Sequence, residues 1–126
     1  MVLAHADSGC TGSVTPHESL LVNRRPCAER FRPATGKVET ATCIGDMPVI
    51  GKAKDGSYVT ETFRNVRCVP SFDYTLLAAK QMWREQRIDS RFADINALVL
   101  SDGRQLPFDE KVELPTLRLL STAGPR

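Results

Sequence analysis

The sequence predicts an all-β barrel or sandwich with one short helix in its second half. Short runs of apolar and β-branched residues recur along the chain, as is typical of strands. Two Asp-Gly pairs, Asp55-Gly56 and Asp102-Gly103, lie between such runs, and Asp-Gly is a strong hairpin signal. After Pro70 the spacing of the apolar residues changes to that of a helix. These observations favour a small β-barrel with one helix packed on it.

The first half of the chain is expected to hold a series of strands and turns. A glycine supplies the positive φ that a hairpin tip needs, which places one tip near Gly36. The expected elements are, in order, a buried strand at residues 2–6, an irregular stretch at 15–33, a hairpin around Gly36, and a strand pair at 47–53 and 58–69.

The second half is expected to begin with a helix at residues 74–85, capped by Asp73. Leu76, Ala79 and Trp83 would share one face of this helix, so we expect Trp83 to be largely buried. Further strands are expected at 88–93, 97–100 and 105–108. We therefore predict a barrel domain at residues 1–108. Residues 109–126 would form a tail or linker, or a strand used at an interface.

Composition excludes few classes of function. The 126 residues suit one domain, and 17 basic against 15 acidic side chains give no argument for nucleic-acid binding. No apolar run approaches the ~20 residues needed to cross a bilayer, and the first residues lack a signal-peptide pattern, so an intracellular location is the default expectation. The cysteines form no Cys-x-x-Cys pair, so we expect free thiols, no metal and no cofactor. They are Cys10, Cys27, Cys43 and Cys68.

The chemical signal is the tripeptide Asp7-Ser8-Gly9 at the end of the first apolar segment. The strand would fix the carboxylate, Gly9 would let a backbone N–H approach it, and Ser8 would hydrogen-bond to a neighbouring loop. An acidic proteolytic site needs two such carboxylates around one water molecule. Because the chain has one such motif, a complete site requires a symmetric dimer. The bare tripeptide is also an ordinary turn.

Four stretches in order resemble the protease segment of copia-type retrotransposon polyproteins, which are relatives of retroviral aspartic proteases. The resemblance covers about Val2 to Phe108. The first stretch matches the catalytic loop, the second the flap hairpin, the third the segment Leu-x-Asn-Val-Leu-Tyr-Val-Pro, and the fourth Asn-Leu-Leu-Ser. In this chain they are residues 7–11, 31–38, 63–70 and 74–78.

The resemblance implies a homodimeric aspartic endopeptidase with a retropepsin-like barrel, which cleaves a polyprotein peptide in the cytoplasm or in a virus-like particle. It implies no membrane partner and no direct contact with nucleic acid. The residues that it implies are Asp7, Ser8 and Gly9 for catalysis, Ala34, Thr35 and Gly36 for the flap, and Leu77 and Ala78 for the floor of the substrate site. Ala78 stands where retroviral relatives have glycine. Six residues precede Asp7, whereas retroviral-type proteases carry further strands there, so either the domain boundary is clipped or the C-terminal tail substitutes for those strands.

Two other functions remain open. The chain would serve as a structural or interaction module if it is a non-catalytic barrel of the same descent. A cysteine hydrolase would use Cys10 and His17, although no orienting partner is evident. Other carboxylates lack the Ser-Gly context and are interpreted as turn, cap or surface residues, namely Asp46, Asp73, Asp89 and Asp94.

Overall fold

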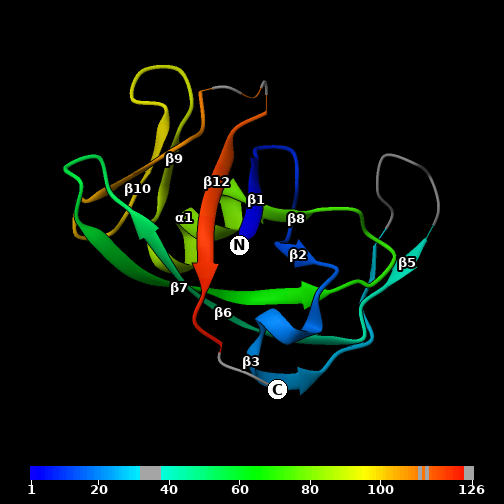
Figure 1. Cartoon of the computed structure of the whole chain (residues 1–126). Helices are drawn as coiled ribbons and strands as arrows, with labels where there is room; N and C mark the ends of the chain where they lie inside the picture. The colour runs from blue at the N-terminus through cyan, green and yellow to red at the C-terminus, as the bar shows by residue number, and fades with distance from the viewer. Residues whose placement is uncertain (32–37, 111, 113, 124–126) are drawn as a thin grey trace.

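Six strands form a closed β-barrel at the centre of the computed structural model, as predicted (Figure 1). The structure describes residues 1–31, 38–110, 112 and 114–123. The barrel order is β12-β1-β8-β2-β7-β6, and pairing of β12 with β6 closes the ring, while β3 extends it beyond β6. These strands are β1 (Val2–Asp7), β2 (Val14–Thr15), β3 (Val22–Pro26), β6 (Cys43–Lys52), β7 (Tyr58–Cys68), β8 (Thr75–Ala78) and β12 (Thr116–Ser121).

The long hairpin of β6 and β7 is the strand pair that the sequence predicts. Its turn contains Gly56 with φ +91°, a backbone conformation that residues other than glycine rarely adopt. Side chains along β6 alternate between the core and the outside, which is the period of a strand with one buried face. Met47, Val49 and Phe63 are among the largest fully buried side chains of the core.

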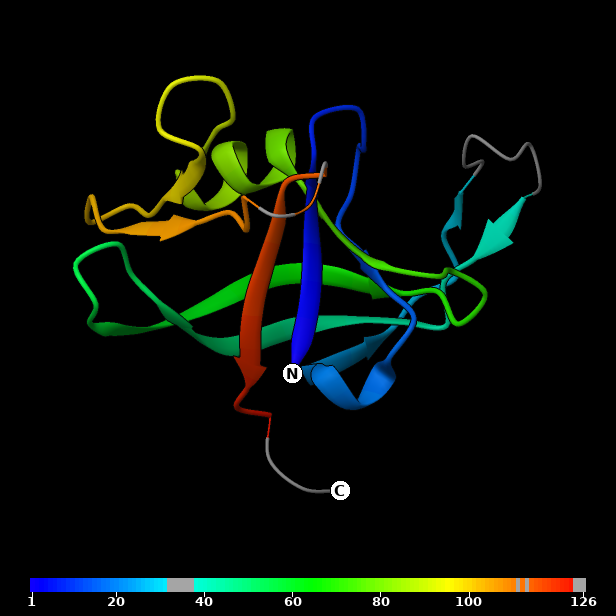
Figure 2. The same ribbon diagram turned by 45° about the horizontal axis from the view of Figure 1, so that its top comes forward.

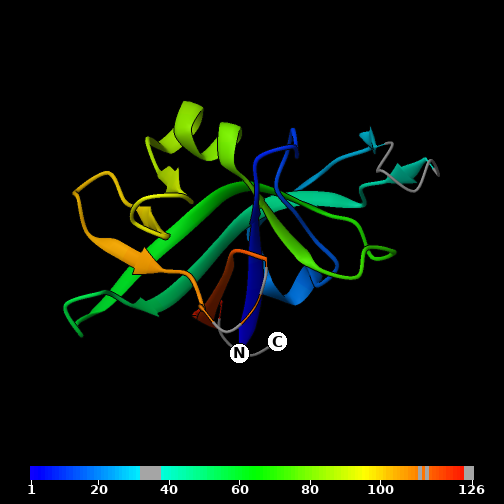
Figure 3. The same cartoon turned by 90° about the horizontal axis from the view of Figure 1, so that it is seen from above.

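A three-stranded sheet and the helix cover one flank of the barrel (Figure 3). Its strands are β9 (Asp89–Arg91), β10 (Ala97–Val99) and β11 (Gln105–Pro107), and it confirms the strands expected in this region. Leu106 packs against the barrel at Gly51, where an added Cβ would lie 2.9 Å from Leu106 Cδ2. Gly51 therefore allows the second sheet to approach β6 closely.

On the opposite flank, β4 (Arg30–Phe31) pairs antiparallel with β5 (Glu39–Thr40) (Figure 3). These two strands are the arms of the hairpin that the sequence places around Gly36. The expected flap residues Ala34, Thr35 and Gly36 lie outside the described residues. A short 3₁₀ helix, Glu18–Leu20, lies between β2 and β3, within the stretch that the sequence predicts to be irregular.

The helix predicted at 74–85 begins later in the structure, and it buries a different face from the one predicted. Residues Thr75–Ala78 form β8, and the helix α1 is Ala79–Gln86. The segment is extended because it pairs in parallel with β1, and this tertiary pairing overrides the helical spacing. The shorter helix buries Met82 and leaves Trp83 50% exposed, with the Arg87 guanidinium 5.0 Å from its ring centroid. The expectation of a buried Trp83 is therefore wrong.

The C-terminal segment belongs to the barrel. Residues expected as a tail or linker from 109 onward include β12, which pairs antiparallel with β1 through Val2↔Leu119 and Ala4↔Leu117. The red strand β12 lies beside the blue strand β1 in both Figure 1 and Figure 2. The barrel therefore continues beyond residue 108, because the inward leucines of β12 complete its core. Among the helices that the structure describes, none has the length and apolar character to cross a membrane.

The contribution of β12 can be tested with two leucines of the same strand. Leu117 is 1% exposed and Leu120 is 54% exposed. We expect Leu117→Ala to lower the free energy of unfolding by about 2–5 kcal/mol, because it leaves a cavity in the core. The matched Leu120→Ala change should stay within about 0.5 kcal/mol. Urea denaturation measures both, and equal effects would mean that β12 does not pack on the barrel in solution.

Candidate active site

Asp7 is the last residue of β1, a strand that lies between β12 and β8. On one side β1 pairs in parallel with β8, in the register Ala6↔Leu77 and Asp7↔Ala78. Alternation along β1 buries Ala4 and Ala6 in the barrel and turns the half-buried side chains of His5 and Asp7 to the other face. The carboxylate is thus presented at a strand end, outside the core, as the sequence predicts.

The loop after Asp7 returns a backbone N–H to the carboxylate. Gly9 N–H donates to Asp7 Oδ1 over 2.8 Å, which is the expected contact. An added Cβ on Gly9 would lie 3.5 Å from the same oxygen, an ordinary contact, so this hydrogen bond does not by itself require glycine. Ser8 and Gly9 are exposed, and no described residue hydrogen-bonds the Ser8 hydroxyl. The predicted bond from Ser8 to another loop is therefore not formed within the described part of one chain.

Two buried polar side chains anchor the far end of this loop. Ser13 Oγ accepts the backbone N–H of Ala78 over 2.9 Å, and Ser13 N–H donates to Gln81 Oε1 over 2.9 Å. Gln81 Nε2 in turn donates to the carbonyls of Arg64 and Asn65 over 3.1 and 3.0 Å. The loop is thereby joined to β7, β8 and α1. Ser13 and Gln81 stand in no recognisable motif, and the one local signal is a polar residue directly before an apolar one, Val14 or Met82.

An ion pair links this network to the base of the β4–β5 hairpin. Arg67 Nε donates to Glu29 Oε2 over 2.6 Å, and Arg67 Nη1 lies 3.3 Å from Gln81 Oε1. The hydrogen bond from Arg67 lowers the pKa of the Glu29 carboxyl below its ordinary value. Glu29 also accepts the Ala41 N–H at its backbone carbonyl over 2.9 Å, next to the β4–β5 pair. The hairpin base and the Asp7 loop therefore share one set of polar contacts.

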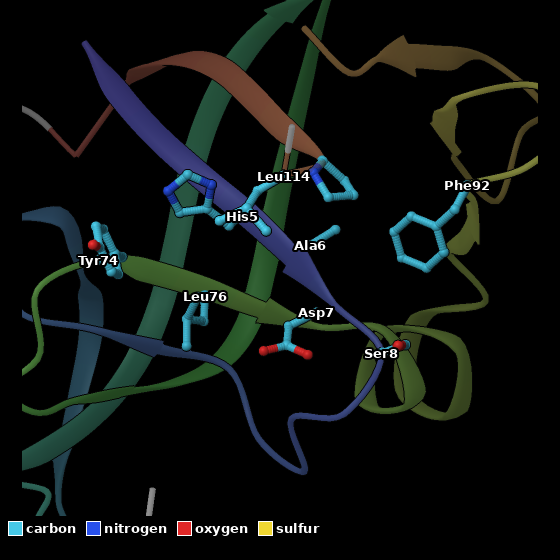
Figure 4. Close-up of a pocket in the computed structure, with 9 residues that line it drawn as sticks. His5, Ala6, Asp7, Ser8, Tyr74, Leu76, Phe92 and Leu114 are labelled. Atoms are coloured by element: carbon cyan, nitrogen blue, oxygen red, sulfur yellow. The ribbon is translucent and has the colours of Figure 1, made fainter. Parts of the chain in front are cut away.

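A cavity of about 310 Å³ lies against Asp7 (Figure 4). Its walls are mostly apolar and come from β1, β8, the segment after β9 and the segment before β12. The lining residues are His5, Ala6, Asp7, Ser8, Tyr74, Leu76, Phe92, Leu114 and Pro115. Of the two expected floor residues, Leu77 is fully buried in the core and Ala78 lies beneath the loop, while the neighbouring Leu76 lines the cavity.

The structure gives no support to catalysis by Cys10. Its Sγ–H donates to the Gly12 carbonyl over 2.8 Å, and burial raises the pKa of the thiol above its ordinary value. A thiol held protonated is a poor nucleophile. His17 is exposed ahead of the 3₁₀ helix, and the hydrogen bond of the Cys10 thiol goes to the Gly12 carbonyl and not to an imidazole. Among the described residues there is also no cluster of His, Cys, Asp and Glu that could hold a metal ion.

The other candidate carboxylates are placed elsewhere. Asp46 accepts the backbone N–H of Asn65 over 3.2 Å, and Asp89 and Asp94 both pair with Arg91. Asp73 is exposed in the segment before β8 and does not cap α1, whose N-cap is Ala78. None of these carboxylates lines the cavity beside Asp7.

Comparison with known proteins adds no relative. No protein-family model, no curated protein and no solved structure matches the chain.

The two serines of the loop, buried Ser13 and exposed Ser8, test whether the buried hydrogen bond stabilises the loop. We expect Ser13→Ala to lower the free energy of unfolding by about 1–3 kcal/mol, because it leaves the buried Ala78 N–H without its acceptor. The control Ser8→Ala alters an exposed side chain and should change stability by less than about 0.5 kcal/mol. Thermal and urea unfolding measure both. A Ser13→Ala protein as stable as Ser8→Ala would show that the loop does not depend on this anchor.

Proposed function

We propose that the chain is an aspartic endopeptidase of a retrotransposon polyprotein and acts as a homodimer. The observation that carries the proposal is the placement of Asp7. Its carboxylate leaves the end of a barrel strand, accepts the Gly9 N–H, and borders a cavity next to the parallel strand β8. The order of the motifs that resemble copia-type proteases agrees with this placement.

The proposed site needs two chains because one chain supplies a single carboxylate, Asp7, to the described lining of the cavity. Among the described residues, no carboxylate other than Asp7 lines the cavity, and Asp46, Asp89 and Asp94 are occupied by hydrogen bonds or ion pairs. Ser8 and Gly9 are exposed beside Asp7, so the loop is free to meet its symmetry mate across a two-fold axis. The exposed Ser8 hydroxyl would then find the opposite loop as its hydrogen-bond partner.

In the proposed dimer, the two Asp7 carboxylates hold one water molecule. Like charges at close range do not both ionise, so the pair shares one proton. The charged carboxylate takes a proton from the water as it attacks the peptide carbonyl carbon. The protonated carboxyl hydrogen-bonds the carbonyl oxygen and stabilises the charge that develops there. Collapse of the tetrahedral intermediate releases the amine and the acid.

The surroundings of Asp7 suit an extended peptide. The loop after Asp7 lies between the β9–β11 sheet on one flank and the β4–β5 arms on the other (Figures 1 and 3). The hairpin would cover the substrate as a flap, and closure over a bound substrate excludes water from the reaction. A polyprotein peptide is the proposed substrate, with processing in the cytoplasm or in a virus-like particle.

Substitution of the carboxylate tests the proposal. We expect Asp7→Asn to reduce peptide cleavage by at least about 10²–10⁴-fold, because the amide keeps the shape but cannot exchange the proton. The control Asp73→Asn changes an exposed carboxylate outside the cavity and should cleave normally. Peptides that span the parent polyprotein are the substrate, and circular dichroism checks that the variants are equally folded.

Wild-type cleavage should be greatest at acidic pH, where the carboxylate pair holds its single proton. Equal cleavage by wild type and Asp7→Asn would remove Asp7 from the mechanism. Absence of cleavage by a folded, dimeric wild type would favour the non-catalytic barrel instead.

A further inference from the structure

A histidine lies two residues before Asp7 on the same face of β1. Both side chains line the cavity, and Figure 4 shows His5 between Tyr74 and the main body of the strand. The imidazole packs edge-on against the Tyr74 ring, with ring centroids 5.3 Å apart and planes at 87°. The remaining walls are mainly aliphatic or aromatic, and among the described lining residues His5 is the one whose side chain offers a nitrogen for hydrogen bonding.

A chain of hydrogen bonds fixes which nitrogen of His5 carries a proton. The hydroxyl of Thr116 has one proton, and it donates that proton to the Leu114 carbonyl over 2.8 Å. Thr116 Oγ1, 2.9 Å from His5 Nδ1, must therefore accept at this contact. Nδ1 is consequently protonated, and Nε2 of the neutral ring is an unprotonated acceptor.

Nε2 lies on the side of the ring away from Thr116, and no described residue forms a hydrogen bond with it. The nitrogen can accept a hydrogen bond when the ring is neutral and donate one when the ring is charged. The Nδ1 contact is the same in both states, so the ring keeps its position. A hydroxyl or a carboxamide, which both donate and accept, matches Nε2 in either state.

We infer that this cavity takes a substrate side chain next to the scissile bond, and that His5 selects one with a hydroxyl or carboxamide on an apolar body. Tyrosine and glutamine fit this description, whereas phenylalanine and leucine leave Nε2 without a partner. The apolar walls from Tyr74, Leu76 and Phe92 contact the carbon body, and Asp7 on the same strand places the selected residue beside the reacting carbonyl. This inference rests on the proposed peptidase function.

Cleavage-site profiling tests the inference. Wild type, His5→Leu, His17→Leu and Asp7→Asn are each incubated with a proteome-derived peptide library, and the new termini are read by mass spectrometry. The best-cleaved peptide is then made as a matched pair that differs only by tyrosine or phenylalanine beside the cleaved bond. His17→Leu is the matched control, because it removes the other histidine, which is exposed and outside the cavity.

We expect wild type and His17→Leu to cleave the tyrosine peptide about five- to tenfold faster, the ratio that one net hydrogen bond supplies. For His5→Leu the ratio should fall to about one while cleavage of the phenylalanine peptide continues. A ratio does not depend on how much of the enzyme is folded. Thr116→Val, which keeps His5 but removes the acceptor at Nδ1, should also lower the ratio and provides the test if His5→Leu does not fold.

Two results would overturn the inference in different ways. Cleavage that depends on Asp7 but has the same tyrosine preference in wild type and in the His5 or Thr116 variant would overturn the role of His5 alone. Absence of any Asp7-dependent cleavage by wild type would overturn the proposed peptidase and this inference with it.

Discussion

The parallel pairing of β1 with β8 is the interaction on which the candidate site depends. Its register joins Ala6 to Leu77 and Asp7 to Ala78, so the carboxylate leaves the sheet beside the start of the helix. A slip of one residue would exchange the two faces of β1. It would bury His5 and Asp7 among the core leucines and expose Ala4 and Ala6. Burying an unpaired carboxylate is costly, so the alternation of small apolar and polar residues in β1 strongly specifies the observed register.

The strands on either side of this pair explain how a short N-terminal strand is held. β12 supplies the second neighbour of β1, and its inward leucines Leu117 and Leu119 close the core beside this strand. Ser13 and Gln81 fix the far end of the loop that follows Asp7 through buried hydrogen bonds. Buried polar groups of this kind are favourable only when each has a partner, so the loop, β8 and α1 stabilise one another.

Local signals in the sequence predicted the parts of the fold that local chemistry decides. Asp55-Gly56 specified its hairpin because its turn needs a positive φ, and Asp7 was placed at a strand exit by the apolar run before it. The helix start and the burial of Trp83 were mispredicted because the pairing of β8 with β1 joins segments about seventy residues apart, which periodicity cannot register. The pairing of β12 with β1 joins residues still farther apart in the sequence, so local patterns do not reveal it.

The contacts of the site were the least predictable part. Ser13, Gln81 and Arg67 are distant in sequence and have no motif, and their importance appears only when the fold brings them together. The cavity likewise combines β1 with residues far along the chain, from Tyr74 to Pro115. The role inferred for His5 depends on its hydrogen bond to Thr116, which in turn donates to the Leu114 carbonyl. The candidate carboxylate could be predicted from the sequence, whereas the residues around it are known only from the way the strands pair in the fold.

The most direct measurement of the central claim is the activity of mixed dimers. Wild type and Asp7→Asn are mixed in equal amounts, allowed to exchange subunits, and assayed at constant total protein. If each active site needs Asp7 from both chains, random pairing leaves about one quarter of the dimers active, and activity should fall to about one quarter of that of wild type alone. Activity of about one half would mean that each chain works by itself, and would contradict a site shared across the two-fold axis.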